Sequence, residues 1–149
     1  MPVRDATESD LDEICALIRE LAAYERLDHE VVFDPADVRT HLFGPDPAAH
    51  VLIAESDQGR VVGFALWYRT FSTFLGRPGI WLEDLFVRPE HRGRGHGLAL
   101  LQALRERTAD RVEWAVLDWN EPSIRFYEAL GAAPVHGWTR YRWLPTTNR

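Results

Sequence analysis

An apolar strand pattern that runs directly into a glycine-spaced turn and then into a helix constrains this sequence more than any other feature. The pattern spans residues 82–97, and its turn reads Arg92-Gly93-Arg94-Gly95-His96-Gly97. Glycine at every second position removes Cβ atoms and allows an anion to approach the backbone closely. The N–H groups of the helix start, with the helix dipole behind them, suit a diphosphate. On the residues alone, this segment is either a phosphate site or simply a tight turn.

The first half of the sequence predicts two helices followed by an antiparallel sheet. Thr7 can cap a helix whose apolar positions recur every three or four residues over 11–22, and Asp34-Pro35 starts a second helix that ends before Gly44. Strands are expected at 51–54, 61–68 and 80–87. Residues 70–79 read either as a loop or as the continuation of the two strands that they join.

The second half alternates between helix and strand. We expect a helix that carries Leu98, Leu101 and Leu104, a strand at 112–117, a helix at 122–130 and a last strand near 138–144. Strand–helix–strand units place their strands in parallel. The predicted class is therefore α/β (α+β), with a mixed central sheet, an antiparallel N-terminal meander and parallel C-terminal strands flanked by helices. The 149 residues are expected to form one domain over 1–149.

Composition narrows the class of partner. The formal net charge is −6, so we expect no nucleic-acid partner and a mild preference for cationic ligands. Cys15 is the only cysteine, which rules out an internal disulfide, and the six histidines lack the spacing of metal ligands, so no metal is expected. The sequence has no membrane-spanning apolar run and no signal-peptide core, which predicts a cytoplasmic protein without a membrane partner.

The glycine segment does not match two well-known phosphate-binding loops, but it does match the loop of another family. The segment lacks the Gly-Lys-Ser/Thr ending of a Walker loop, and its strand belongs to a meander and not to a dinucleotide-binding βαβ unit. Residues 92–97 resemble the Arg/Gln-x-x-Gly-x-Gly/Ala signature of the GCN5-related N-acetyltransferases (GNAT). Residues 82–87 and 119–127 are similar to the diamine (spermidine/spermine) and thialysine N-acetyltransferases. The resemblance implies the GNAT fold and an N-acetyltransferase that uses acetyl-CoA.

The resemblance also implies a binding site for acetyl-CoA. The pantetheine arm would pair, like a guest strand, with the backbone of Leu85, Phe86 and Val87. The diphosphate would bind the successive backbone amides of Arg92, Gly93, Arg94, Gly95, His96, Gly97 and Leu98. The side chains of Arg92 and Arg94 would add positive charge. Asn120, together with Ser123, would contact the arm from the next helix. From the residues alone, Asn120 reads equally well as the N-cap of that helix.

Two catalytic roles follow from the resemblance. Tyr127 would be the general acid that protonates the departing CoA thiolate, although its spacing from Ile124 also fits an aromatic at the edge of the core. Glu83 would bind the substrate amine and take its proton through water, because an ammonium cannot attack. The competing interpretation of Glu83 is a solvated strand carboxylate.

The resemblance places the amine in an acidic cleft. Tyr24 and Glu25 match a pair that contacts the polyamine in the similar enzymes, and Glu25, Glu83 and Asp84 would together attract an extended cation. Because neighbours on a strand face opposite sides of a sheet, at most one of Glu83 and Asp84 is expected to point into a given pocket.

The C-terminal region departs from the diamine enzymes. Those enzymes carry an acidic residue before a Gly-Trp pair, whereas His136 precedes Gly137-Trp138 here. The difference weakens spermidine or spermine as the acceptor and leaves a shorter diamine, a lysine analogue such as thialysine, or another cationic metabolite.

The leading hypothesis is therefore direct attack of a primary amine, on a small cationic substrate, on acetyl-CoA in a ternary complex. Acetylation of a protein lysine or N-terminus is one alternative, and a non-catalytic acetyl-CoA-binding regulatory module is another. The similar enzymes also lead us to expect a homodimer, for which the six tryptophans offer interface anchors.

Overall fold

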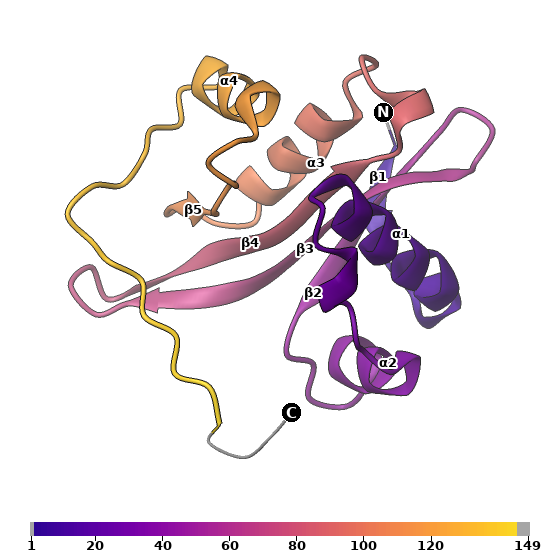
Figure 1. Ribbon diagram of the computed structural model, residues 1–149, viewed down its shortest axis with the longest axis horizontal. Helices are drawn as coiled ribbons and strands as arrows, with labels where there is room; N and C mark the ends of the chain where they lie inside the picture. The colour runs from indigo at the N-terminus through magenta and orange to yellow at the C-terminus, as the bar shows by residue number, and fades with distance from the viewer. Residues whose placement is uncertain (1, 146–149) are drawn as a thin grey trace. The chain divides into compact units, whose positions relative to one another are not determined.

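A mixed sheet of five strands in the order β1-β2-β3-β4-β5 is the centre of the fold (Figure 1). The structure is a computed structural model that describes residues 2–145. Its strands are β1 (Val3–Asp5), β2 (His50–Glu55), β3 (Val61–Ser72), β4 (Arg77–Val87) and β5 (Val112–Glu113). Strands β1 to β4 are antiparallel neighbours, and β5 runs parallel to β4. The predicted mixed sheet with an N-terminal meander and a parallel C-terminal pair is confirmed.

The helices divide between two compact units, residues 1–115 and 116–149. The first unit holds the sheet and the helices α1 (Leu11–Tyr24), α2 (Pro35–Phe43) and α3 (His96–Arg105), with 3-10 turns η1 (Glu8–Asp10), η2 (Asp28–Glu30) and η3 (Pro89–His91). The second unit holds α4 (Glu121–Ala129). The single domain over 1–149 stays a prediction.

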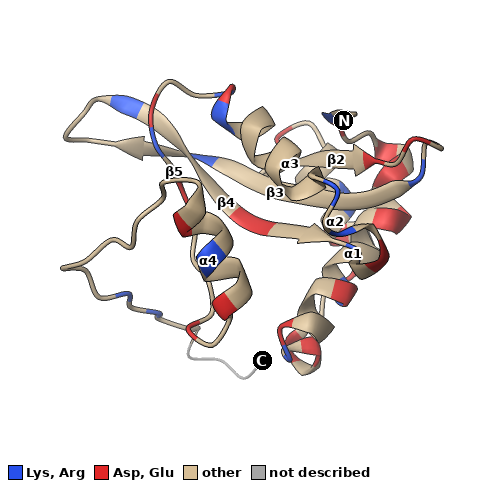
Figure 2. Cartoon of the chain, turned by 90° about the horizontal axis from the view of Figure 1, so that it is seen from above, with Lys and Arg blue, Asp and Glu red and all other residues tan. Residues whose placement is uncertain are grey.

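Helices α1 and α3 cover opposite faces of the sheet (Figure 2). The buried stripe of α1 packs in one cluster with alternate residues of β2, β3 and β4, namely Ile14, Leu17, Leu21, Val51, Ile53, Phe64 and Phe86. The stripe of α3 buries Leu100 and Leu104, and at its end the guanidinium of Arg107 lies over the ring of Trp67. Trp67 has the opposite strand parity to Phe64, so it faces the other side of β3.

The C-terminal strands are shorter than expected. The predicted strand at 112–117 is limited to β5, and residues 138–144, predicted as a last strand, form none. The aromatic side chains there are exposed, with 81% for Trp138 and 94% for both Tyr141 and Trp143. Aromatic and alternating residues suit a strand, but a strand also needs a sheet edge to pair with, and nothing in the local pattern supplies that edge. Residues 70–79, left open by the pattern, continue β3 and β4 as a hairpin in which Ser72 pairs with Arg77.

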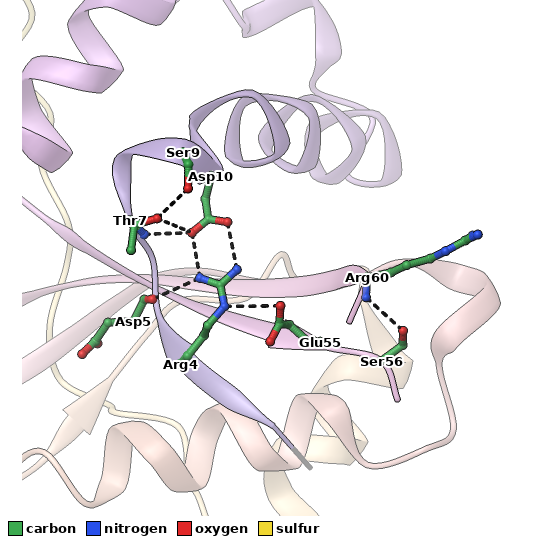
Figure 3. A network of polar contacts seen from close by, with 8 residues as sticks. All are labelled: Arg4, Asp5, Thr7, Ser9, Asp10, Glu55, Ser56 and Arg60. Carbon is green, nitrogen blue, oxygen red and sulfur yellow. Dashed lines mark hydrogen bonds and ion pairs between the residues drawn. The ribbon is translucent and has the colours of Figure 1, made fainter. Parts of the chain in front are cut away.

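An ion-pair network ties β1 to the start of α1 and the end of β2 (Figure 3). The Arg4 guanidinium donates two hydrogen bonds to the Asp10 carboxylate, at 2.8 and 2.9 Å, and lies 3.3 Å from a Glu55 oxygen. The N–H of Thr7, the N-cap of η1, also donates to Asp10, at 2.8 Å. The bond from Arg4 lowers the pKa of Asp10 from 3.8, against the opposing effect of burial.

Replacing Arg4 with Ala is expected to lower the free energy of unfolding by about 1–2 kcal/mol at pH 7, because it leaves the Asp10 carboxylate buried without its cation. We place the loss below that of a fully buried pair because the Arg4 side chain is 37% exposed. Since the pKa of Asp10 is depressed in the folded protein, this stabilisation is present above about pH 4 and fades as the pH falls through the folded value.

Urea unfolding followed by circular dichroism at pH 7 and pH 3 measures the effect of Arg4→Ala. The exposed Arg39 on α2 supplies the control Arg39→Ala, for which a change within about 0.5 kcal/mol is expected. A loss of equal size at both pH values would mean that Arg4 contributes by packing and not through the Asp10 carboxylate.

Candidate active site

A β-bulge interrupts β4 at its two acidic residues. Leu82 pairs with Trp67 on β3, and Asp84 pairs with the next residue along, Leu66, so Glu83 is an extra residue with no counterpart. A bulge of this kind breaks the strict alternation of side chains and re-aims those beside it. Glu83 and Asp84 therefore do not obey the simple rule that neighbours face opposite sides.

The register places Asp84 on the α1 face of the sheet, and a hydrogen bond ties Glu83 to Trp81 on the same face. Trp81 and Asp84 pair with Tyr68 and Leu66, which are two residues apart on β3 and so share a face. The carboxylate of Glu83 accepts a hydrogen bond from the indole N–H of Trp81, at 2.9 Å. The bulge breaks the strict alternation on which the expectation about a shared pocket depends, and that expectation stays a prediction.

A third carboxylate comes from the end of α1. Burial, and then the charges of Glu83 and Glu25, raise the pKa of Asp84 from 3.8 to about 7. Burial, followed by the charge of Glu83, also raises the pKa of Glu25. Figure 2 shows acidic residues on β4 and along α1. The charge of Glu83 thus opposes the ionisation of both Asp84 and Glu25, so a bound cation would relieve an existing repulsion.

The turn after α1 fixes the position of Glu25. The N–H of Leu27 donates to the carbonyl of Ala22 at 2.8 Å, and the N–H of Arg26 donates to the carbonyl of Ala23 at 3.1 Å. These two bonds form a Schellman motif, in which the residue after the C-cap is usually glycine. Arg26 occupies that position with φ 62°, a left-handed conformation that costs about 1 kcal/mol in a non-glycine residue. Such strain beside a predicted substrate residue is typical of functional sites.

Arg92 links the acidic end of α1 to the glycine loop. Its guanidinium carbon lies 5.0 Å from the ring centre of Tyr24 and 5.3 Å from that of Phe86, and the two rings are 6.4 Å apart. Its Nε donates to the carbonyl of Val87 at 2.8 Å. Predicted substrate residues and predicted acetyl-CoA residues of the first unit therefore meet around one side chain.

The glycine loop presents backbone N–H groups that no hydrogen bond within the described residues 2–145 uses. Gly93 and Gly95 have φ values of 77° and 87°, a conformation that glycine adopts without strain. The first bond of α3 runs from the N–H of Ala99 to the carbonyl of Gly95, at 2.9 Å. Within residues 2–145 no backbone hydrogen bond uses an N–H of 93–98, whereas the N–H of Arg92 donates to Pro89. A Cβ on Gly93 would meet no atom within 4 Å, so there is space beside the amides for an anion.

Strand β4 also has an open edge. It pairs with β3 from Gly63↔Val87 to Ser72↔Arg77, but with β5 only at Ile80 and Trp81. Across the described residues, 82–87 of β4 have no strand partner on the side away from β3. An extended ligand arm can add to such an edge as a further strand, which is the role predicted for Leu85, Phe86 and Val87.

In the second unit, α4 carries the other predicted site residues. The side chain of Asn120 accepts a hydrogen bond from the N–H of Ser123 at 3.4 Å, so Asn120 is the N-cap of α4, one of its two predicted roles. Tyr127 is half-buried near the helix end, and its carbonyl accepts from the N–H groups of Leu130 and Ala132, at 3.1 and 3.2 Å. The end of the helix therefore holds the backbone of Tyr127 firmly.

Two residues of the site region were not singled out from the sequence. Trp81 holds Glu83, and its position two residues earlier on the same strand was an available signal. Arg88 donates to Glu13 at 2.8 Å and to Glu20 at 3.0 Å, so it ties the start of the glycine segment to α1. The Arg88 contacts join positions far apart in the chain and leave no local signature.

A surface hollow of about 490 Å³ lies beside Glu13 and Arg88. It is lined by Glu13, Gly59, Arg60, Val61, Arg88, Glu90 and His91. None of the predicted site residues lines it, so we assign it no role in the site.

Comparison with known proteins gives the family. The model of the acetyltransferase (GNAT) family matches residues 15–132. The thialysine N-epsilon-acetyltransferase of Bos taurus is 40% identical over 94% of this chain and 90% of its own length. The L-ornithine N5-acetyltransferase NATA1 of Arabidopsis thaliana is 28% identical over 91% of this chain and 81% of its own length. An integron cassette protein from V. cholerae superposes with a TM-score of 0.78 at 23% identity, covering 97% of this chain and 93% of that one, which shows the fold alone.

This chain belongs to the acetyltransferase (GNAT) family. It is accordingly an enzyme of the acyltransferase class, and the resemblance noted in residues 82–97 and 119–127 is confirmed. None of the helices within residues 2–145 combines the length and apolar character needed to cross a membrane. In the same residues no three His, Cys, Asp or Glu side chains are grouped so that they could hold a metal ion.

Proposed function

We propose that this enzyme transfers the acetyl group of acetyl-CoA to a primary amine of a small cationic substrate, such as a diamine, a polyamine or a lysine analogue like thialysine. The observation that supports it most is the cluster of Glu25, Glu83 and Asp84, in which burial, and then the charges of Glu83 and Glu25, raise the pKa of Asp84 to about 7. An ammonium group neutralises such a cluster, and a carboxylate of that basicity can take its proton.

The co-substrate fits the residues that are present. The unused amides of 93–98 and the open edge of β4 supply donors for a diphosphate and for an extended arm. Acetyl-CoA would bring the acetyl group as a thioester. The chain's own residues would bind the amine at the acidic cluster, remove its proton there, and return a proton to the leaving thiolate from Tyr127.

The names of relatives support an amine acceptor. The bovine relative is named for thialysine and the plant relative for the side-chain nitrogen of ornithine, and both compounds carry a terminal primary amine. His136, which replaces an acidic residue of the polyamine enzymes, lies in the exposed segment after α4. We therefore rank short amino-acid amines above spermidine. A cytoplasmic location and a homodimer remain part of this proposal.

A CoA-release assay tests the proposed function. Thialysine, ornithine, putrescine, spermidine and a lysine-containing peptide are each supplied with acetyl-CoA, and release without amine is subtracted. We expect turnover with at least one small amine, at a kcat/KM at least about tenfold above that for the peptide.

Each other outcome of the assay has a definite meaning. A preference for the peptide would indicate a protein acetyltransferase. Acetyl-CoA binding by calorimetry without turnover on any amine would indicate a regulatory module. The absence of any heat with acetyl-CoA at millimolar concentration would contradict the proposed function as a whole.

A further inference from the structure

The two neighbouring carboxylates of β4 have different hydrogen-bond environments. The Glu83 side chain is exposed and accepts the indole N–H of Trp81 at 2.9 Å. The indole N–H of Trp81 therefore fixes the position of the Glu83 carboxylate.

Asp84 has the opposite surroundings. It is half-buried beside Leu66, on the α1 face of the sheet, and two residues before the buried Phe86. Among residues 2–145 no donor forms a hydrogen bond with its carboxylate. The charged groups that act on it are Glu83, on its own strand, and Glu25, at the end of α1. Burial without a donor, next to two anions, favours the protonated form of a carboxyl group.

We infer that Asp84, and not Glu83, accepts the proton that the substrate ammonium must lose, while Trp81 positions Glu83 as the neighbouring anion that holds the amine. This assignment rests on the proposed function and differs from the role that the family resemblance gives to Glu83. In the step, an N–H bond of the ammonium breaks and an O–H bond forms on the Asp84 carboxylate. The free amine keeps the electron pair with which it attacks, and Asp84 later releases the proton to water.

The basicity of Asp84 agrees with this role. A general base works best when its pKa lies near the working pH, and burial and the two neighbouring charges raise that of Asp84 to about 7. Because the pKa is raised, the group is protonated below about pH 6 and becomes a competent base only as the pH rises through about 7. The profile of kcat/KM against pH, which reports groups of the free enzyme, should therefore fall on its acidic side with a midpoint near 7.

The pH dependence of kcat/KM for thialysine separates the two carboxylates. Asp84→Asn should lower kcat/KM about 100-fold or more and remove the acidic limb. Glu83→Gln should keep the limb and move it to lower pH, because one of the two charges that raise the Asp84 pKa is gone. Trp81→Phe should also keep the limb and raise the KM for thialysine more than it lowers kcat. The exposed Asp12 on α1 provides the control Asp12→Asn, which should match the unmodified enzyme.

An acidic limb that survives in Asp84→Asn and disappears in Glu83→Gln would overturn the assignment, as long as both variants show the unfolding temperature of a folded protein. A carbon-13 NMR titration of the Asp84 carboxyl in the unliganded protein needs no turnover. A midpoint near 7 that falls in Glu83→Gln supports the assignment, and an ordinary value near 4 overturns it. An unmodified enzyme that acetylates no amine, despite a midpoint near 7, would overturn the proposed function and the assignment with it.

Discussion

Tyr127→Phe is expected to lower kcat by roughly 10²- to 10⁴-fold, the range that one general acid contributes. The KM for acetyl-CoA should change by less than about threefold, because an interaction made only in the transition state affects kcat and not ground-state binding. Steady-state kinetics with thialysine or the best amine of the panel measures both quantities.

The design of this variant follows from the end of α4. Tyr127 is held through its carbonyl by the N–H groups of Leu130 and Ala132, and the ring lies 5.5 Å from that of Phe126. Replacing only the hydroxyl leaves both contacts available, so folding should be preserved. Tyr141 belongs to the same unit and is 94% exposed, and Tyr141→Phe is the matched control. A normal kcat in Tyr127→Phe would remove Tyr127 from the mechanism, and a rise in KM alone would make it a binding residue.

The elements that could be predicted are those whose signals are local. Asp34 caps α2 through a bond to the N–H of Ala36, Asn120 caps α4, and Gly93 and Gly95 form the turn that the glycine spacing predicted, in left-handed conformations. Each of these depends on residues within one turn of the chain, where side-chain chemistry and backbone geometry are directly coupled. For the same reason, a strand, an anion-binding turn and a helix could be predicted for residues 82–97 from the local sequence.

The features that escaped prediction depend on distant partners. The bulge at Glu83 exists only in the pairing of β4 with β3, so the sequence of β4 alone could not reveal that the alternation of its side chains is interrupted there. The pKa of Asp84 is raised first by burial in the folded protein and then by the charges of Glu83 and of Glu25, which lies 59 positions earlier in the chain (84 − 25). Residues 138–144 have the composition of a strand but form none. Composition indicates that a segment suits a sheet, but it does not show that a sheet edge is available for pairing. The chemistry of this site is thus set by tertiary contacts between elements that were individually well predicted.

Gly95→Ala is expected to weaken acetyl-CoA binding by about tenfold or more. Gly95 precedes α3 with φ 87°, a conformation that costs an alanine about 1 kcal/mol or more, and relaxation of that strain would turn the loop amides away from the ligand. Each charge-assisted hydrogen bond lost to the diphosphate removes a further ~1.5–3 kcal/mol. Calorimetry with acetyl-CoA measures the affinity directly. Once acetyl-CoA is saturating, kcat should recover to within a few-fold of the unmodified enzyme, because the residues proposed for proton transfer are unchanged.

The control for this variant separates backbone strain from ligand contact. Gly59, in the turn between β2 and β3, has φ 78° and open space where a Cβ would lie, so Gly59→Ala introduces a similar strain at a position outside the loop. Both variants should lose about 1 kcal/mol of stability, and only Gly95→Ala should lose affinity for acetyl-CoA. Equal, unchanged affinity in both would mean that the amides of 93–98 do not hold the diphosphate. A loss in both would trace the effect to general destabilisation. A loss of affinity for acetyl-CoA in Gly95→Ala alone would show that the glycine loop binds the co-substrate.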